Sequence, residues 1–237
     1  MRPIQGIILD IDGTLLDSND AHAQAWHEAI SAHGHEREYE EVRKLIGMGG
    51  DQLLPALLSL SIDSEEGKAI AETRDTVFER DYLAGLDPFP EATTLVHLLA
   101  ERGFSLTVAS SSAKSDLRKF LKILEIGDVI DSKSSADDAE HSKPAPDLIE
   151  AALDKLGLSA DEVIMIGDTP YDIAAAKKAG VHTVALRCGG WDDRALSGAA
   201  EIYDDPADLI KHIDRSPLFK PVMRVKNHEP DRSSAQI

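Results

Sequence analysis

The chain has 237 residues, of which 42% are hydrophobic and 29% are charged, a balance that excludes fibrous and intrinsically disordered proteins. Its formal net charge of −18 at pH 7 argues against a nucleic-acid partner, because an acidic surface repels phosphate backbones. Cys188 is the single cysteine, which excludes an internal disulfide, and no apolar run approaches the roughly 20 residues of a membrane span.

The first residues lack a basic region followed by an apolar signal core. We therefore expect a cytoplasmic protein that does not associate with membranes.

The first predicted element is a buried strand over residues 4–9, whose continuous apolar character favours a parallel sheet covered on both faces. Asp10 and Asp12 follow at its carboxyl end, directly before Gly13 and Thr14. Side chains two residues apart on a strand point to the same face, so both carboxylates can share one site or one divalent cation. The Asp-Gly step is equally typical of a simple turn.

Residues 19–86 differ from the rest, because charged helical segments follow one another without a clear strand. We expect helices over residues 21–32, 40–46, 51–60 and 64–84. Pro88 and Pro90 mark the return of the chain to the main domain. This pattern predicts a helical insert directly after the first strand.

A glycine-rich loop within the insert is the candidate substrate-facing turn. It contains Gly47, Gly49 and Gly50, and Arg43 and Lys44 come just before it. The alternative is that these glycines simply connect two helices.

Four histidines of the insert, His22, His27, His33 and His35, do not have the spacing of a compact metal-ligand set. We interpret them as solvated side chains.

Beyond the insert, apolar strands alternate with amphipathic helices. We expect strands over residues 104–109, 163–166 and 181–186, and helices over residues 92–102, 114–124, 147–156 and 173–179. This alternation predicts an α/β fold with a doubly wound parallel sheet and a site at the carboxyl ends of its strands. The expected division is a core of residues 1–18 and 87–215, a helical cap of residues 19–86, and a mobile C-terminal tail of residues 216–237.

Three further motifs lie at or beside predicted strand ends. Ser110 and Ser111 offer hydroxyl donors for an oxyanion, or a cap for the next helix. Lys143 precedes a proline-bounded helix start, where a surface lysine is the simpler interpretation. Asp168 follows a strand, and Asp172 lies four residues later, where helix capping alone would explain it.

The four motifs in this order, from the Asp-x-Asp-Gly-Thr pair to the Gly-Asp-x-x-x-Asp, resemble those of the haloacid dehalogenase-like hydrolases. The resemblance covers roughly residues 4–213, and the insert looks like the helical cap of the capped phosphatases and β-phosphoglucomutases in that family. It implies a core with a doubly wound sheet and metal-dependent phosphoryl transfer.

The resemblance also implies roles for individual residues. Asp10 matches the nucleophile that becomes an aspartyl phosphate, and Asp12 matches the general acid and base. Ser110, with Ser111 beside it, and Lys143 match the groups that hold phosphoryl oxygens. These groups suit phosphoryl transfer, whose transition state spreads charge over the equatorial oxygens.

The implied cofactor is Mg²⁺, a hard cation that prefers oxygen ligands. Asp10, Asp168 and the backbone carbonyl of Asp12 match its ligands. Asp172 is then a further ligand or a partner that contacts one of the ligands.

The implied activity is that of a magnesium-dependent phosphatase acting on a small phosphorylated metabolite. Asp12 disfavours the halide-cleaving and phosphonate-cleaving members, which resemble this pattern without a carboxylate at that position. A sugar phosphomutase stays open as an alternative, because the same residues can return the phosphoryl group to a sugar. A catalytically silent binding protein on the same fold is the third interpretation.

Overall fold

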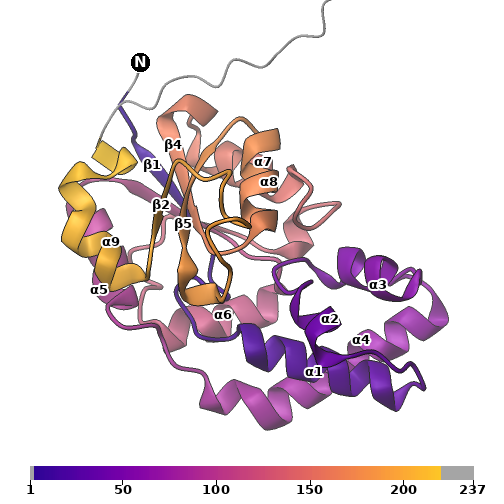
Figure 1. Ribbon diagram of the computed structural model, residues 1–237. Coiled ribbons are helices and arrows are strands. Elements are labelled where there is room, and N and C mark those ends of the chain that lie inside the picture. The colour runs from indigo at the N-terminus through magenta and orange to yellow at the C-terminus, as the bar shows by residue number, and fades with distance from the viewer. Residues whose placement is uncertain (1–2, 220–237) are drawn as a thin grey trace, which may run out of the picture.

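Six parallel strands form one sheet in the order β3-β2-β1-β4-β5-β6 in the computed structural model, which describes residues 3–219 (Figure 1). The strands are β1 (Gly6–Leu9), β2 (Ser105–Ala109), β3 (Ser132–Ser134), β4 (Val163–Gly167), β5 (His182–Leu186) and β6 (Glu201–Tyr203). The chain places β2 and β3 on one side of β1 and then crosses to β4 on the other side. The predicted doubly wound α/β fold is confirmed, and its switch point lies at the carboxyl end of β1.

Helices cover both faces of the sheet because successive strand residues point to opposite sides. Ile7 and Leu9 belong to the core cluster on one face, and Ile8 belongs to the cluster on the other. The first face packs against α5 (Ala92–Glu101), α6 (Lys114–Ile123) and α9 (Pro206–His212). The second packs against α7 (Asp147–Leu156) and α8 (Pro170–Lys178). Burial on both faces accounts for the continuous apolar runs of the central strands.

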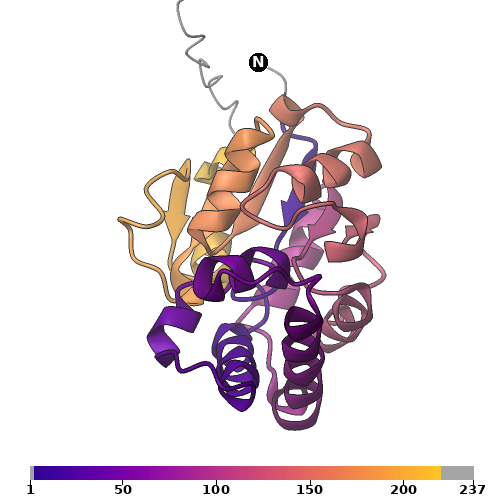
Figure 2. The ribbon, with the colours of Figure 1, turned by 90° about the vertical axis from the view of Figure 1, so that its right-hand side faces the viewer.

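The chain between β1 and β2 forms a helical insertion, as expected. Its helices are α1 (Asn19–Ala32), α2 (Tyr39–Arg43), α3 (Gly50–Leu58) and α4 (Glu65–Val77), followed by a π-helical turn, Phe78–Tyr82, and a 3-10 turn, Leu83–Gly85. These helices, which we call the cap, have an apolar cluster of their own around Trp26, Ile30 and Leu54. Figures 1 and 2 show the cap beneath the edge of the sheet at which β1 ends.

The last described residues pack on the sheet domain. Pro217–Phe219 form a 3-10 turn, and Leu218 is 1% exposed within the main core cluster. Ser216 and Leu218, which lie in the segment expected to be a mobile tail, are thus buried, and residues 220–237 lie outside the described residues. Between residues 3 and 219, no helix is both long and apolar enough to cross a bilayer.

Candidate active site

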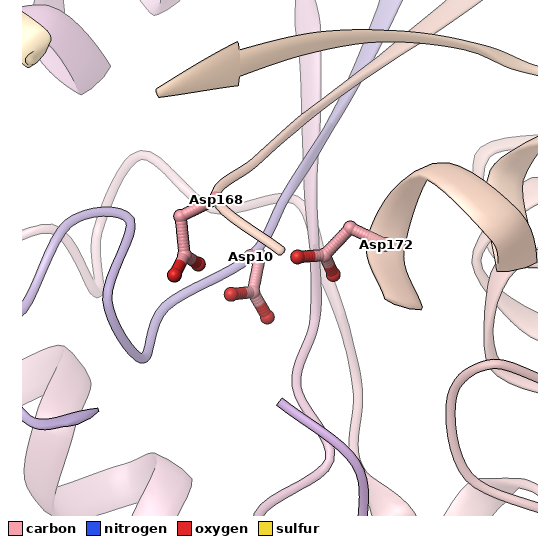
Figure 3. Close-up of side chains that lie close together, drawn as sticks. All are labelled: Asp10, Asp168 and Asp172. Atoms are coloured by element: carbon pink, nitrogen blue, oxygen red, sulfur yellow. The ribbon is translucent and has the colours of Figure 1, made fainter. Parts of the chain in front are cut away.

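Three aspartates meet at the carboxyl edge of the sheet. Asp10 follows β1, Asp168 follows β4, and Asp172 lies in the first turn of α8 (Figure 3). Each contributes a carboxylate oxygen to a group whose members lie within 4.8 Å of one another, and all three residues are buried. The sheet creates this proximity because β1 and β4 are neighbouring strands. Their pairing continues to Asp10, whose backbone N–H donates to the Ile166 carbonyl at 2.9 Å. Three oxygen ligands this close suit a hard divalent cation.

Lys143 lies against the same aspartates. Its Nζ is 2.5 Å from Oδ1 of Asp10 and 2.7 Å from Oδ1 of Asp172. The residue is only 1% exposed, so these carboxylates, and not water, stabilise its ammonium group. The simpler interpretation, a surface lysine, therefore does not apply.

The aspartate cluster carries more negative charge than Lys143 can neutralise. Burial raises the pKa of Asp10 to about 7, because Lys143 opposes this shift only in part and Asp172 and Asp12 add repulsion. Burial also raises the pKa of Asp168 well above its usual value, with further repulsion from Asp172 and Asp10. Burial alone would lower the pKa of Lys143, but Asp10 and Asp172 raise it overall. A bound cation would relieve this excess of negative charge.

Asp172 serves the helix and the cluster with different oxygens. Its Oδ2 accepts hydrogen bonds from the backbone N–H and the hydroxyl of Thr169, at 2.9 and 2.7 Å, which completes a capping box at the start of α8. Its Oδ1 faces Lys143. The two interpretations of Asp172 are therefore compatible.

Asp12 points away from the aspartate cluster into a set of hydrogen-bond donors. Oδ1 accepts from Ser18 and from Nε2 of His22, both at 2.7 Å, and Oδ2 accepts from Ser112 at 2.9 Å and Ser110 at 3.3 Å. Burial raises the pKa of Asp12, but the contacts with His22, Ser18 and Ser112 outweigh burial and hold it well below its usual value. Because both carboxylate oxygens of Asp12 are engaged in this way, its backbone carbonyl is the only part of Asp12 left as a candidate metal ligand.

His22 is a site residue that the sequence analysis missed. We interpreted its side chain as solvated, but the residue is only 5% exposed. Its ring stacks on Phe78 with a centroid distance of 4.4 Å. Nδ1 lies 2.6 Å from Nη2 of Arg74. Arginine can only donate, so Nδ1 must accept, and the Nε2–H donates to Asp12. Arg74 thereby sets the tautomer of His22.

A signal for His22 exists in the sequence, although a weak one. His22 lies in the first turn of the helix that directly follows the Asp-x-Asp motif, four residues after Ser18. Residues i and i+4 share a helix face, so Ser18 and His22 can reach the same carboxylate. Arg74 lies 52 residues further along, and nothing local in the sequence pairs it with His22.

A cavity of about 210 Å³ lies between the cap and the core, with Asp10 and Asp12 in its wall. Its cap side includes the predicted loop residues Gly47, Gly49 and Gly50. The cap side of the cavity is lined by apolar side chains and by three polar or charged ones: Trp26, Ile46, Met48, Ile62 and Ala71, with His22, Arg74 and Asp75. Only a small group fits in a space of this size.

The structure separates the remaining predicted site residues. Ser111 lines the cavity, and its hydroxyl donates to the Gly47 carbonyl at 3.3 Å, whereas Ser110 is fully buried behind it against Asp12. Arg43 and Lys44 do not reach this cavity. They line a separate crevice with Trp191 and Asp192.

Comparisons with known proteins agree with this geometry. The sequence profile of the haloacid dehalogenase-like hydrolases matches residues 7–186. The chain is 30% identical over 214 residues to a phosphoglycolate phosphatase of Rhodospirillum rubrum, covering 86% of this chain and 89% of that protein. A phosphoglycolate phosphatase of Aquifex aeolicus is also 30% identical, over 213 residues, covering 88% and 96%.

A solved structure shares the fold as well. The crystal structure of a hydrolase from Pseudomonas syringae has a TM-score of 0.84 and 32% identity, and the match covers 89% of this chain and 98% of that one. The expected enzyme class, a phosphoric monoester hydrolase, is confirmed at the level of the family. The chain belongs to the haloacid dehalogenase-like hydrolases.

Proposed function

We propose that the protein is a magnesium-dependent phosphatase that hydrolyses a small phosphorylated metabolite through an aspartyl phosphate on Asp10. One observation carries this proposal: Asp10 faces Lys143 and two further buried aspartates, and it opens to a cavity shared with Asp12. Two carboxylates with opposite pKa shifts then stand beside one reacting centre, which is the arrangement that separates a nucleophile from an acid/base group.

The metal would be held by Asp10, Asp168 and the backbone carbonyl of Asp12, with Asp172 beside them. When bound, Mg²⁺ would neutralise charge on the transferring phosphoryl group and keep Asp10 deprotonated. The raised pKa values of Asp10 and Asp168 support this assignment, because both carboxylates gain a counterion there. Lys143 supplies the fixed positive charge on the other side of Asp10.

In the first step, a carboxylate oxygen of Asp10 attacks phosphorus, and the bond from phosphorus to the leaving oxygen breaks. Asp12 gives its proton to that oxygen, so the leaving group departs as a neutral alcohol. Asp12 is ionised in the free protein because its pKa is low. A bound phosphoryl dianion beside it raises that pKa by like-charge repulsion, which favours the acid form.

In the second step, water attacks the phosphorus of the aspartyl phosphate, and the bond to Asp10 breaks. Asp12 accepts the proton of that water, and inorganic phosphate leaves with Asp10 restored as a carboxylate. The hydrogen bonds from Ser18, His22 and Ser112 hold Asp12 in place through both proton transfers.

The cavity supports a small leaving group. A volume of about 210 Å³ accommodates a compact sugar or short organic acid beside Asp10 and Asp12. The relatives named phosphoglycolate phosphatases support a compact acid as one member of this class.

Phosphate release from a panel of phosphorylated metabolites tests the proposal, with Mg²⁺ present and then removed by a chelator. We expect release from small substrates only, and only with metal. A hexose 1-phosphate that is converted to its isomer without phosphate release would contradict hydrolysis and favour a mutase.

A further inference from the structure

Arg43 is the last residue of α2, and its guanidinium reaches from the cap to the core. Nη2 donates to the Gly189 carbonyl at 2.8 Å, and Nε donates to Asp20 at 2.6 Å. The Arg43 side chain is 18% exposed, whereas that of Asp20 is 79% exposed. The bond to Gly189 is therefore partly shielded from solvent, and Asp20 orients the guanidinium from the more exposed side.

The Gly189 carbonyl has a second donor that leads to the aspartate cluster. Nδ2 of Asn19 donates to this carbonyl at 3.1 Å and to Oδ2 of Asp168 at 2.9 Å. A Cβ on Gly189 would lie 1.7 Å from the same oxygen of Asp168, so the turn Arg187–Gly189 packs directly on that carboxylate. Arg43 thus contacts a backbone group that touches a candidate metal ligand.

The orientation of Asn19 depends on this carbonyl. Asn19 is 2% exposed, and its Oδ1 has no hydrogen-bond partner among the described residues. A flipped amide would direct Oδ1 at the carboxylate of Asp168 and the carbonyl of Gly189, which are both acceptors. The two acceptors together therefore keep the Asn19 amide directed at Asp168.

We infer that Arg43 is a positioning residue that couples the contact between cap and core to the metal cluster. Its bond to Gly189 holds the turn Arg187–Gly189 and the Asn19 amide against Asp168. When the cap leaves the core, this bond breaks and Asp168 loses part of its support. The inference rests on the proposed metal site, and it assigns Arg43 a role other than the substrate contact expected from the sequence.

This coupling is reciprocal. If the Arg43 contact strengthens metal binding at Asp168, metal binding must strengthen the Arg43 contact by the same factor. Mg²⁺ should therefore hold the cap against the core even without substrate.

Another contact between cap and core offers a matched comparison. The Tyr171 hydroxyl donates to the Lys44 carbonyl at 2.5 Å, directly beside Arg43 in the sequence. No hydrogen bond connects Lys44 to Gly189 or Asp168 among the described side chains. Tyr171→Phe therefore removes one bond between cap and core while leaving the support of Asp168 in place.

Isothermal titration of the full chain with MgCl₂, without substrate, tests the inference. We expect Arg43→Met to weaken Mg²⁺ binding by roughly 5- to 10-fold, at the lower end of typical coupling factors. Tyr171→Phe should change it by less than about twofold on the same reasoning. Arg43→Lys, which keeps the charge and one donor, should recover part of the affinity. Thermal unfolding without metal checks that each variant is folded.

Amide hydrogen exchange gives a second measurement. In the wild type, Mg²⁺ should slow exchange in the turn Arg187–Gly189, and this protection should be smaller in Arg43→Met. If Arg43→Met is folded and binds Mg²⁺ as the wild type does, the inference is wrong. An equal loss of affinity in Tyr171→Phe, or no Mg²⁺ binding by the wild type, also overturns it.

Failure of the proposed function looks different. A wild type that binds Mg²⁺ in an Arg43-dependent way but releases no phosphate from any substrate would overturn the phosphatase proposal and leave this coupling standing.

Discussion

Asp10 and Asp12 are two residues apart, yet their surroundings shift their pKa values in opposite directions. Asp10 faces Asp168 and Asp172 and has a pKa raised to about 7, whereas Asp12 faces four hydrogen-bond donors and has a lowered pKa. The tight turn after β1 produces this difference. Gly13 has a φ of +79°, and a Cβ there would lie 2.4 Å from Asp168, so only glycine lets the chain turn beside the cluster.

Asp10→Asn should lower kcat by at least about a thousandfold, because an amide is a poor nucleophile. The fold should persist, since the amide is isosteric with the carboxylate. Steady-state kinetics and thermal unfolding measure the two effects. Asp17→Asn is the matched control, because Asp17 is exposed in the same loop and should retain wild-type activity. Wild-type turnover in Asp10→Asn would exclude Asp10 as the nucleophile.

His22→Leu should lower kcat roughly tenfold to a hundredfold, because Asp12 loses one of the donors that orient it for proton transfer. Removing this donor also raises the pKa of Asp12, so the basic limb of the pH profile of kcat/KM, where Asp12 has lost the proton that it donates in the first step, should move to higher pH. His27→Leu is the control, since His27 lies on the same helix and contacts the Arg37 carbonyl within the cap. A pH profile that does not move would argue against the pairing of His22 with Asp12.

The central strands could be predicted from the sequence and the edge strands could not. The apolar runs of β1, β2, β4 and β5 reflect burial on both faces. The edge strands β3 and β6 have three residues each, with the sequences Ser-Lys-Ser and Glu-Ile-Tyr, and neither has an apolar run. Each edge strand forms by pairing with the strand beside it in the sheet, and its own short sequence carries no signal of that pairing.

The same distinction applies to the site. Asp10 and Asp168 follow strand ends, Asp172 lies in the first turn of the helix after β4, and Lys143 lies in the loop before α7. For these residues, motif and topology together predict proximity. The pairing of Arg74 with His22 and of Arg43 with Gly189 depends on how the cap packs on the core. We expected Arg43 beside the substrate because the sequence places it next to the glycine loop, but α2 ends with its side chain directed elsewhere.

Gly47→Ala should lower kcat/KM at least about tenfold, because the cap loop could no longer seat on the core. A Cβ at Gly47 would lie 2.7 Å from Cγ2 of Thr169, and its φ of +104° disfavours other residues. Gly34→Ala is the control, since Gly34 has a φ of +83° with open space around it. Both variants should lose about 1 kcal/mol of stability from backbone strain. Equal activities of the two variants would show that the contact with Thr169 is not needed.

The protein as a whole carries a net charge of −18 and concentrates part of its negative charge in a buried cluster. In the metal-free protein, Asp10 and Asp168 keep protons that the unfolded chain releases near pH 4. The folded state then binds more protons than the unfolded state, so these two groups favour folding below pH 4. Their contribution falls as the pH rises toward the pKa of about 7 for Asp10.

Mg²⁺ should therefore stabilise the protein more at pH 8 than at pH 5, because protons compete with the metal at the lower pH. At a hundred times its Kd, bound metal adds about 2.7 kcal/mol to the free energy of unfolding. Thermal unfolding with and without MgCl₂ at the two pH values measures this difference. Asp168→Asn should abolish most of the shift, and an equal shift at both pH values would contradict the account.

Detection of the phosphorylated residue tests the central claim most directly. Asp12→Asn, incubated with Mg²⁺ and an aryl phosphate whose leaving group needs no proton, should accumulate the phosphoenzyme because water activation is lost. After an acid quench, peptide mass spectrometry should place the phosphoryl group on Asp10, and the double variant with Asp10→Asn should remain unlabelled. A phosphoryl group on Ser110 or another residue, or full turnover without any covalent intermediate, would contradict the mechanism.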